Sequence, residues 1–404
     1  MASRARPQGP ARAGATVRTR ELGIEIGVGT PGLLNAITDV AGVAVGHATL
    51  IEGHGPLVVG EGPIRTGVTV IKPHAGIPAE EPLFAGFHSL NGNGEVTGLL
   101  WLKESGQLAS PIGLTNSHSV GVVRDTLVAI ESEERQPGHL FWSLPVVGET
   151  WDGMLNDING FHVKADHVRQ AYEAASGGPV AEGSVGGGTG MICYQFKGGI
   201  GTSSRVLPAE SGGYTVGVLV QTNFGARDDY VVNGAPVGRH LNEDVIPLPA
   251  PPEYAEHTPA GSFAPPTGAG SIVGVVATDA PLLPHQCDRL AQRVGLGVAR
   301  TGNSGDHWSG DIFVAFSTAN RLPGSNVTWR APLTSQVNVL SNNYMDPFFD
   351  AVVEATQEAI LNAQLAAKTM VGRDRVTAYR LDAERLVHVL RKYDRMKFAN
   401  PKRR

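Results

Sequence analysis

The chain contains 404 residues, of which 41% are hydrophobic and 18% charged, and its formal net charge is −5. These proportions exclude a disordered chain and are compatible with one large domain or two ordinary ones. The sequence shows neither the basic stripe of a nucleic-acid-binding protein nor an apolar run long enough to span a membrane.

The first 20 residues are rich in Arg, Ala, Pro and Gly and contain no acidic residue and no apolar signal-peptide core. We therefore expect residues 1–20 to form a disordered tail and the protein to be cytoplasmic. The two cysteines, Cys193 and Cys287, lack zinc-type spacing, which favours two buried thiols in a reducing compartment. No set of His, Cys, Asp and Glu has metal-ligand spacing, so we expect neither a metal nor another cofactor.

Short strands, turns and a few helices are predicted for the first half of the chain. The turn residues at 91–94 (NGNG) precede one helix and provide it with capping groups. The predicted strands are Val40–Val45, Val68–Ile71 and Tyr214–Thr222, and the predicted helices are Glu95–Lys103, Val120–Ile130 and Ala165–Tyr172.

Two glycine-rich segments invite comparison with nucleotide-binding loops. No Gly-Lys-Ser/Thr follows the run at 183–190, and Gly27–Gly32 contains Pro31 and is not followed by a predicted helix, so we exclude that function for both. We expect the 183–190 run to permit close backbone packing beside an active site instead.

A proline-rich segment at 245–270 is the only long low-complexity stretch inside the chain. We interpret it as an exposed linker, which is unusual inside a compact domain and requires a functional explanation. It ends at Gly270, directly before a predicted apolar strand at Ser271–Thr278. Layered α/β structure is then predicted from the alternation of Pro284–Val294 (helix), Asp311–Phe316 (strand), Pro347–Val371 (helix, with Asp346 as N-cap and Gly372 as stop signal) and Asp382–Tyr393 (helix).

The Gly270–Ser271 junction suggests a specific chemistry. A serine hydroxyl is a poor nucleophile unless a base takes its proton. A serine that begins a chain can use its own α-amine, whose ordinary pKa of about 7.7–8.0 suits a general base. The preceding Gly removes side-chain hindrance and permits a strained backbone that favours cleavage. A linker that simply enters a strand is the alternative explanation.

Segments over nearly the whole chain resemble the L-aminopeptidase/D-esterase family, which includes the β-peptidyl aminopeptidases. They occur in the family's order from about Glu21 to about Val371. The segments are Thr38–His47, Leu90–Gly98, Gly113–Gly121, Val147–Val163, Glu182–Arg205, Val218–Asp228, Thr267–Leu282 and Ala299–Thr318.

The resemblance implies a layered αββα sandwich of the N-terminal-nucleophile-like type that is shared with ornithine acetyltransferases. It also implies a precursor that is cleaved between Gly270 and Ser271 into an α chain, residues 21–270, and a β chain, residues 271–404, of one domain. The processed units are expected to assemble into a homo-oligomer, often a tetramer of αβ units.

The same resemblance assigns Ser271 as the nucleophile. It places Ser309 and Asp311 near that residue, where Ser309 would orient the amine proton and Asp311 would hold Ser309 or counter the ammonium form. A tight turn before a strand is the alternative for these two residues. Asn223 matches an asparagine that donates to the oxyanion, although a turn asparagine before Gly225 is the alternative.

Glu149 matches an acid that lies beside the free amino group of the substrate, with a solvated surface acid as the alternative. Trp151 is the candidate for an aromatic residue near the oxyanion site. Met154 stands where that aromatic residue is expected, so a backbone N–H is an alternative second donor.

Thr115 and Asn116, together with Ser117 and His118, precede a predicted helix. We expect them to line the substrate pocket or, alternatively, to cap the helix. His118 is interpreted as structural.

These observations predict an autoprocessing aminopeptidase, amidase or esterase that removes N-terminal residues from short peptides, amides or esters through an acyl-enzyme on Ser271. The substrate has a free N-terminus, and neither nucleic acid nor a membrane is an expected partner. One alternative is an acyltransferase on the same fold, which is disfavoured because ornithine acetyltransferases use Thr as nucleophile. The others are a hydrolase of cyclic or synthetic amides and an unprocessed, non-catalytic binding protein.

Overall fold

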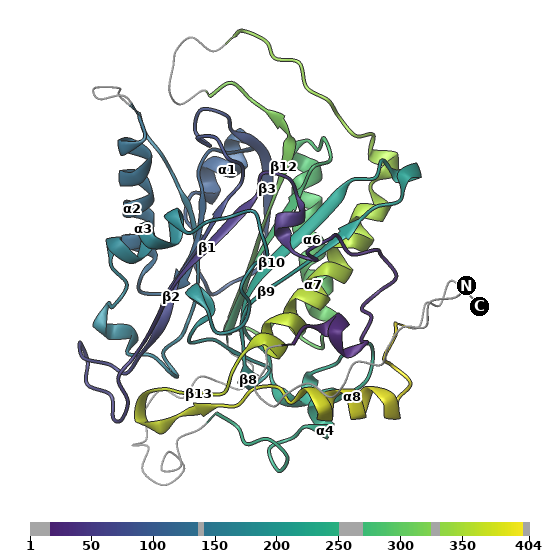
Figure 1. Cartoon of the computed structure of the whole chain (residues 1–404). Coiled ribbons are helices and arrows are strands. Elements are labelled where there is room, and N and C mark those ends of the chain that lie inside the picture. Colours follow the sequence, from purple (N-terminus) through teal and green to yellow (C-terminus); the bar gives the residue numbers. More distant parts are fainter. Residues whose placement is uncertain (1–16, 136–140, 250–269, 325–331, 399–404) are drawn as a thin grey trace, which may run out of the picture.

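The computed structural model describes residues 17–135, 141–249, 270–324 and 332–398. Two β-sheets pack face to face, and a layer of helices covers the outer face of each (Figure 1). The layers are α2 with α3, a four-stranded sheet, a six-stranded sheet, and α6 with α7. The predicted layered α/β class is therefore confirmed.

The four-stranded sheet has the order β1-β2-β5-β6, and β5 is parallel to β6. Helices α2 (Val120–Glu133) and α3 (Ala165–Glu173) cover its outer face through an apolar cluster that includes Val68, Val123 and Val168. The strands are β1 (Ala44–Glu52), β2 (Ile64–Lys72), β5 (Ile112–Asn116) and β6 (Val146–Thr150).

The six-stranded sheet has the order β4-β3-β12-β11-β10-β9, so β11 lies in its interior between β12 and β10. Its outer face is covered by α6 (Pro284–Ala299) and α7 (Asp346–Ala366). The strands are β3 (Leu83–Gly92), β4 (Gln107–Leu108), β9 (Gly199–Val206), β10 (Thr215–Asn223), β11 (Gly270–Thr278) and β12 (Ser309–Arg321).

Side chains of β11 alternate between two apolar cores, as a strand covered on both faces requires. Val273 and Val275 lie in the core between the two sheets, whereas Ile272 and Val276 pack in the core beneath α6 and α7. This alternation establishes which face of the sheet each residue near the start of β11 presents.

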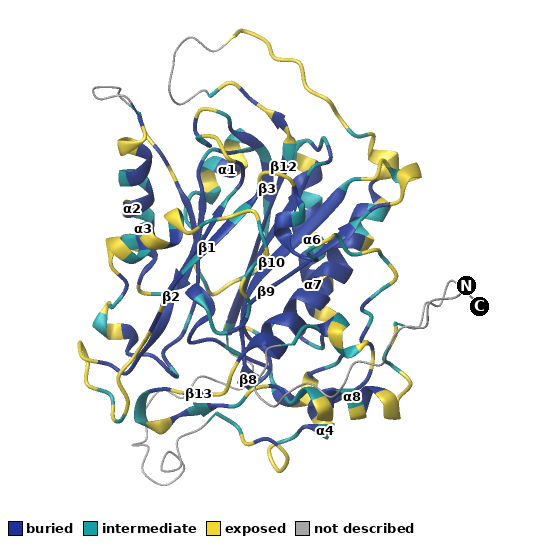
Figure 2. Cartoon of the chain, in the orientation of Figure 1, coloured by how far each residue is buried: buried dark blue, intermediate teal, exposed yellow. Residues whose placement is uncertain are grey.

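Helix α7 is buried along most of its length (Figure 2), so its carboxylates need partners inside the protein. The Arg205 guanidinium lies 3.2 Å from Glu354 and 2.7 Å from Glu358, and Arg20 lies 2.9 Å from Glu358. These contacts and a short 3-10 helix at Thr19–Leu22 hold the start of the described chain. The prediction of a disordered tail is thus wrong for residues 17–20, and residues 1–16 lie outside the described part.

Most predicted elements are present with small changes at their ends. These are the helices that became α2, α3, α6 and α8 (Ala383–Lys392) and the strands that became β2, β10, β11 and β12. Cys193 and Cys287 are free and buried, as predicted.

Two predicted starts are wrong. The strand expected at Val40–Val45 begins only at Ala44, because Gly42 adopts a φ of +91° in a turn. The helix expected at Glu95–Lys103 is α1 (Leu99–Ser105), because Thr97 N donates to Val147 O at 3.0 Å and ties the preceding residues to β6.

The predicted end of the long helix at Val371 is also wrong. Helix α7 stops at Ala366, and Met370–Val371 forms β13, which pairs with β14 (Thr377–Ala378). Asp346 is the first helical residue, and Met345 occupies the cap position that was predicted for it.

The glycine run at 183–190 packs tightly against neighbouring backbone and side chains. A Cβ atom on Gly187 would lie 2.2 Å from Gln221 Oε1, and one on Gly188 would lie 2.4 Å from Ile200 N. The prediction of close packing is confirmed.

Three further short elements are α4 (Val237–His240), β7 (Ile192–Cys193) and β8 (Phe196–Lys197). Of the predicted linker at 245–270, residues 250–269 lie outside the described part. Among the helices that the structure describes, none combines the length and the apolar composition that a membrane span requires.

Candidate active site

Ser271 is the second residue of β11 and is only 4% exposed. Its Oγ lies 2.7 Å from the carbonyl oxygen of Gly270 and accepts a hydrogen bond of 3.2 Å from Gly310 N on β12. The hydroxyl is thus held directly beside the peptide bond that the sequence predicts to be cleaved.

Gly270 is required for a steric reason. A Cβ atom on this residue would lie 2.0 Å from the carbonyl oxygen of Asn223 and 2.8 Å from Phe224 Cα, both in the backbone of the adjacent segment. Gly270 lies within β11 and is not among the residues with positive φ, so the structure supports the expected freedom from hindrance but not the expected strained backbone.

The Ser271 side chain points between the two sheets. It lies two residues before Val273, whose side chain belongs to the inter-sheet core, and alternate residues of a strand share a face. Asn223 is the directly paired residue on β10, so its side chain lies on the same face as that of Ser271.

The amide of Asn223 is oriented by two backbone groups. Ile192 N donates to Asn223 Oδ1 at 2.8 Å, and Asn223 Nδ2 donates to Trp151 O at 2.8 Å. Since a backbone N–H can only donate, the first contact fixes which end of the amide is the oxygen. An amide nitrogen carries two hydrogens, and the hydrogen bonds among the described residues use one of them.

Ser309 and Asp311 lie on the opposite face of the sheet from the Ser271 hydroxyl, because Phe313, two residues further on, packs beneath α6 and α7. Ser309 Oγ donates to Asp311 Oδ1 at 2.6 Å, and Ile272 N donates to the same oxygen at 3.3 Å. Burial raises the pKa of Asp311 to about 6, and the Ser309 hydroxyl opposes that rise. The pair can therefore reach the backbone nitrogen side of β11, where the amine of a cleaved chain would be.

Glu149 approaches from the other sheet, near the end of β6, and is 6% exposed. Its carboxylate accepts from Glu95 N at 2.9 Å and from the Ser117 hydroxyl. A Cβ atom on Gly94 would lie 3.2 Å from Glu149 Oε1 and 3.1 Å from Gly310 Cα, so only a glycine separates this carboxylate from the backbone that holds Ser271. Burial raises the pKa of Glu149, and the bond from Ser117 opposes this.

Thr115 and Asn116 turn into the protein instead. Both are buried, and they donate to Gly67 O at 2.9 Å and Thr66 Oγ1 at 2.7 Å, respectively. Asn116 Oδ1 also accepts from His118 N at 3.0 Å, a turn contact before the helix. The cap residue of α2 is Ser119 and no side chain caps that helix, so the capping alternative is wrong as well. Of this segment, Ser117 is the residue that reaches a candidate catalytic group.

Histidine residues make no hydrogen bond to Ser271 in the described part of the chain. His118 is exposed and stacks on Phe161 with ring centroids 5.8 Å apart. No group of three or more His, Cys, Asp or Glu residues suited to a metal occurs in the part of the chain that the structure describes.

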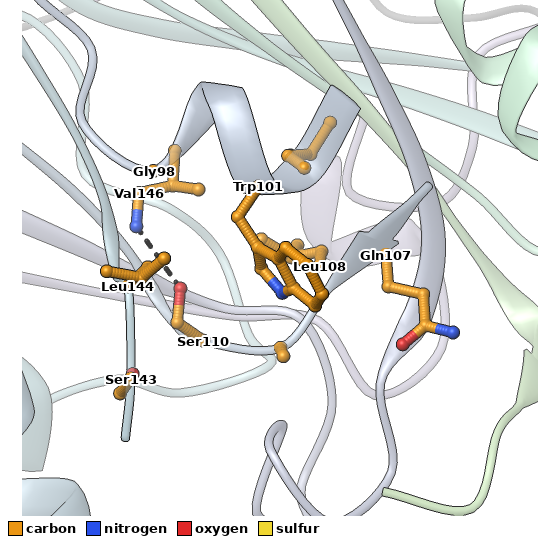
Figure 3. A pocket seen from close by; sticks show the side chains of 10 residues that line it. Gly98, Trp101, Gln107, Leu108, Ser110, Ser143, Leu144 and Val146 are labelled. Carbon is orange, nitrogen blue, oxygen red and sulfur yellow. Dashed lines mark hydrogen bonds between the residues drawn. The ribbon is translucent and has the colours of Figure 1, made fainter. Parts of the chain in front are cut away.

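A small pocket beneath α1 lies apart from the Ser271 site and shares none of its residues (Figure 3). It is bordered by Trp101 and Leu108, and Ser110 Oγ within it accepts from Val146 N at 3.2 Å, at the opposite end of β6 from Glu149.

Comparison with known proteins identifies the family of this chain. The model of peptidase family S58 matches residues 35–378. Beta-peptidyl aminopeptidase BapA from Sphingosinicella microcystinivorans is 48% identical over 94% of this chain and 93% of that protein. BapA from Sphingosinicella xenopeptidilytica is 44% identical over 93% and 91%.

Solved structures agree with the sequence relatives. A Burkholderia sp. beta-aminopeptidase superposes with a TM-score of 0.84 and 51% identity, covering 93% of this chain and 99% of that one. The L-aminopeptidase D-Ala-esterase/amidase from Ochrobactrum anthropi, described as a prototype for the serine aminopeptidases and a new variant among the Ntn hydrolase fold, has a TM-score of 0.82 and 42% identity over 94% and 99%. The chain therefore belongs to peptidase family S58 and is an aminopeptidase of that family.

Proposed function

We propose that this chain is a precursor that cleaves its own Gly270–Ser271 bond and then acts as an N-terminal-serine aminopeptidase. The observation that carries the proposal is the position of the Ser271 hydroxyl, 2.7 Å from the Gly270 carbonyl oxygen at the start of a buried interior strand. A hydroxyl in this place can attack the preceding carbonyl, and hydrolysis of the resulting ester would leave Ser271 with a free amine.

In turnover, the Ser271 amine would take the proton of the Ser271 hydroxyl as it attacks the substrate carbonyl. Asn223 would donate its second amide N–H to the oxyanion, and Glu149 would bind the substrate ammonium. Ser309 and Asp311 would orient the amine from the other face of the sheet. The acyl-enzyme ester would then be hydrolysed by water, with the same amine as base.

The identity of the nucleophile favours hydrolysis over acyl transfer. One solved relative is described as an Ntn hydrolase variant, and the fold is expected to be shared with ornithine acetyltransferases, which transfer acyl groups from a threonine. Since this chain has a serine at 271, we assign water as the acceptor.

The substrate class is a short peptide, amide or ester with a free N-terminus, and the names of the relatives favour β-amino acid residues at that end. A panel of paired α- and β-aminoacyl anilides tests this assignment. Turnover restricted to anilides with a free amine supports it, and equal turnover of N-acetylated anilides contradicts it.

We also propose that the processed units form a homo-oligomer, such as a tetramer of αβ units, in the cytoplasm. Mass measurement of the native assembly tests the first part, because the unit mass of 42.4 kDa predicts discrete multiples.

The Glu149→Gln variant is expected to raise KM at least tenfold for substrates with a free ammonium. The reason is that Gln lacks the charge that compensates a buried ammonium, while its side chain has the same shape. KM for an analogue in which hydrogen replaces the amine is expected to change little. Glu95→Gln is the matched control, since it removes a neighbouring exposed acid. Equal increases for both substrates would assign Glu149 to structure alone.

Turnover is expected to rise with pH through one limb between about pH 6 and 9, because only the neutral amine accepts a proton. The pKa of Asp311 is about 6, so Asp311 is ionised over most of this range and favours the ammonium. Asp311→Asn should therefore lower the pKa of the amine and move the limb by about one unit to lower pH. Asp166→Asn is the control, because Asp166 is an exposed acid on α3, which covers the outer face of the other sheet. A limb that stays in place or moves upward in Asp311→Asn would contradict the assigned role.

A further inference from the structure

Lys197 is the last residue of β8 and is completely buried. Met191 lies six residues earlier, directly before β7. Its Nζ donates to the carbonyl oxygens of Met191 at 2.7 Å, Gly198 at 2.9 Å and Gly188 at 3.4 Å. All three acceptors are backbone groups, and Lys197 occurs in none of the ion pairs formed by described residues. A buried ammonium is costly, so its retention here needs a reason.

The shortest of these bonds, from Lys197 Nζ to Met191 O, connects Lys197 to Asn223 through one peptide unit. The Met191 carbonyl and the Ile192 N–H are the two ends of one planar peptide unit. Lys197 Nζ binds the oxygen end at 2.7 Å, and the N–H end donates to Asn223 Oδ1 at 2.8 Å. Asn223 in turn shares its face of the sheet with Ser271, and the hydrogen bonds among the described residues use one of its two amide hydrogens.

We propose that Lys197 is a positioning residue for the oxyanion site, which acts through the Met191–Ile192 peptide unit to fix and polarise the side-chain amide of Asn223. This inference rests on the proposed function, because it requires Asn223 to be an oxyanion donor. It adds a residue that no histidine, serine or carboxylate pattern in the sequence indicates.

Two amide groups, the Met191–Ile192 peptide and the Asn223 side chain, transmit the polarisation from Lys197. A cation at a carbonyl oxygen withdraws electron density from the peptide and makes its N–H a stronger donor, and hydrogen bonds in a chain strengthen one another in this way. A stronger bond to Asn223 Oδ1 likewise makes the Nδ2 hydrogens more positive. The same bonds prevent the Asn223 amide from rotating, so the donor is in place before the oxyanion forms.

The three carbonyl oxygens around Nζ match the three N–H groups of the charged form of Lys197. Burial lowers the pKa of the Lys197 ammonium to about 7, and attraction to the buried Asp152 carboxyl opposes that fall. Asp152 follows Trp151, whose carbonyl oxygen accepts the other amide bond of Asn223. Both backbone anchors of Asn223 are therefore adjacent to buried ionisable groups.

The test uses the processed full-length enzyme and the variant Lys197→Met, which has nearly the same shape but no donor. We expect kcat to fall by about tenfold to a hundredfold, by analogy with the loss of a hydrogen-bond partner that orients a metal ligand. KM should stay within about twofold, since the oxyanion exists only in the transition state. Gln364→Met is the matched control: Gln364 Nε2 is buried and donates to Cys193 O in β7 at 3.0 Å, but not to the peptide that contacts Asn223. It should leave kcat within about threefold.

A double-mutant cycle with Asn223→Ala separates positioning from general damage. If Lys197 acts through Asn223, adding Lys197→Met to Asn223→Ala costs less than about threefold, whereas equal losses in both backgrounds overturn the proposal. Lys197→Gln, which keeps a neutral donor, should recover part of kcat. If neither Lys197 variant folds and is processed while Gln364→Met is, Lys197 is a folding residue and the proposal is also overturned. A loss below tenfold in Asn223→Ala alone would instead contradict the proposed role of Asn223, and this is seen without any Lys197 variant.

Discussion

The Ser271→Ala variant is expected to remain one chain of 404 residues and to show no measurable aminopeptidase turnover. Its side chain has no oxygen to attack the Gly270 carbonyl, and without cleavage no free amine forms at residue 271 to serve as base. Both functions of the residue are lost together. Denaturing gel electrophoresis and intact-mass measurement should show fragments 1–270 and 271–404 for the natural sequence and a single full-length species for the variant.

Ser271→Cys is the matched control, because a thiol of similar size is also a nucleophile and should still permit cleavage. Unchanged thermal unfolding of Ser271→Ala would show that the buried strand β11 is intact. Efficient cleavage of Ser271→Ala at the same bond would mean that another protease makes the cut, and the autoprocessing model would then be abandoned.

The sequence predicted the elements around this junction because they depend on local patterns. The strand β11 is a continuous β-branched run, and such a run is recognisable when both of its faces are buried. The order of the helices and strands after residue 270 gave the layered class for the same reason. Element ends were less predictable: α1 begins four residues late because Thr97 bonds to β6, a strand some 50 residues away in the chain.

Predictions for the site depended on how far each residue relies on partners elsewhere. The spacing of Ser309 and Asp311 is local, and they do form a hydrogen-bonded pair beside β11. Thr115 and Asn116 directly precede a helix, and from that position we expected them to line the pocket. Their side chains point inward instead, because they donate to residues of β2. No sequence pattern shows these partners. Lys197 was missed because a lysine followed by two glycines is typical of an exposed turn, and only the structure shows the three carbonyl oxygens around its Nζ.

The Asn223→Ala variant is expected to be processed and folded but to have a kcat lower by roughly 10²–10³, the usual effect of removing one oxyanion donor. KM should change little, because the substrate carbonyl gains its full negative charge only in the transition state. The two backbone contacts of Asn223 are also lost, which should reduce the free energy of unfolding by about 1–3 kcal/mol. Thermal unfolding and steady-state kinetics on the same preparation measure the two effects separately.

Asn233→Ala supplies the control for this loss of stability. Asn233 is 7% exposed against 8% for Asn223, and its Nδ2 donates to the carbonyl oxygens of Glu25 and Arg395 rather than to groups near Ser271. Its replacement should lower stability at least as much, because Asn233 also has a φ of +49°, which Ala tolerates less well, and should leave kcat within about threefold. If Asn223→Ala loses less than about tenfold in kcat with its fold intact, the amide lies outside the mechanism. The oxyanion would then have to be bound by backbone N–H groups of the sheet, among which Gly310 N already lies 3.2 Å from Ser271 Oγ.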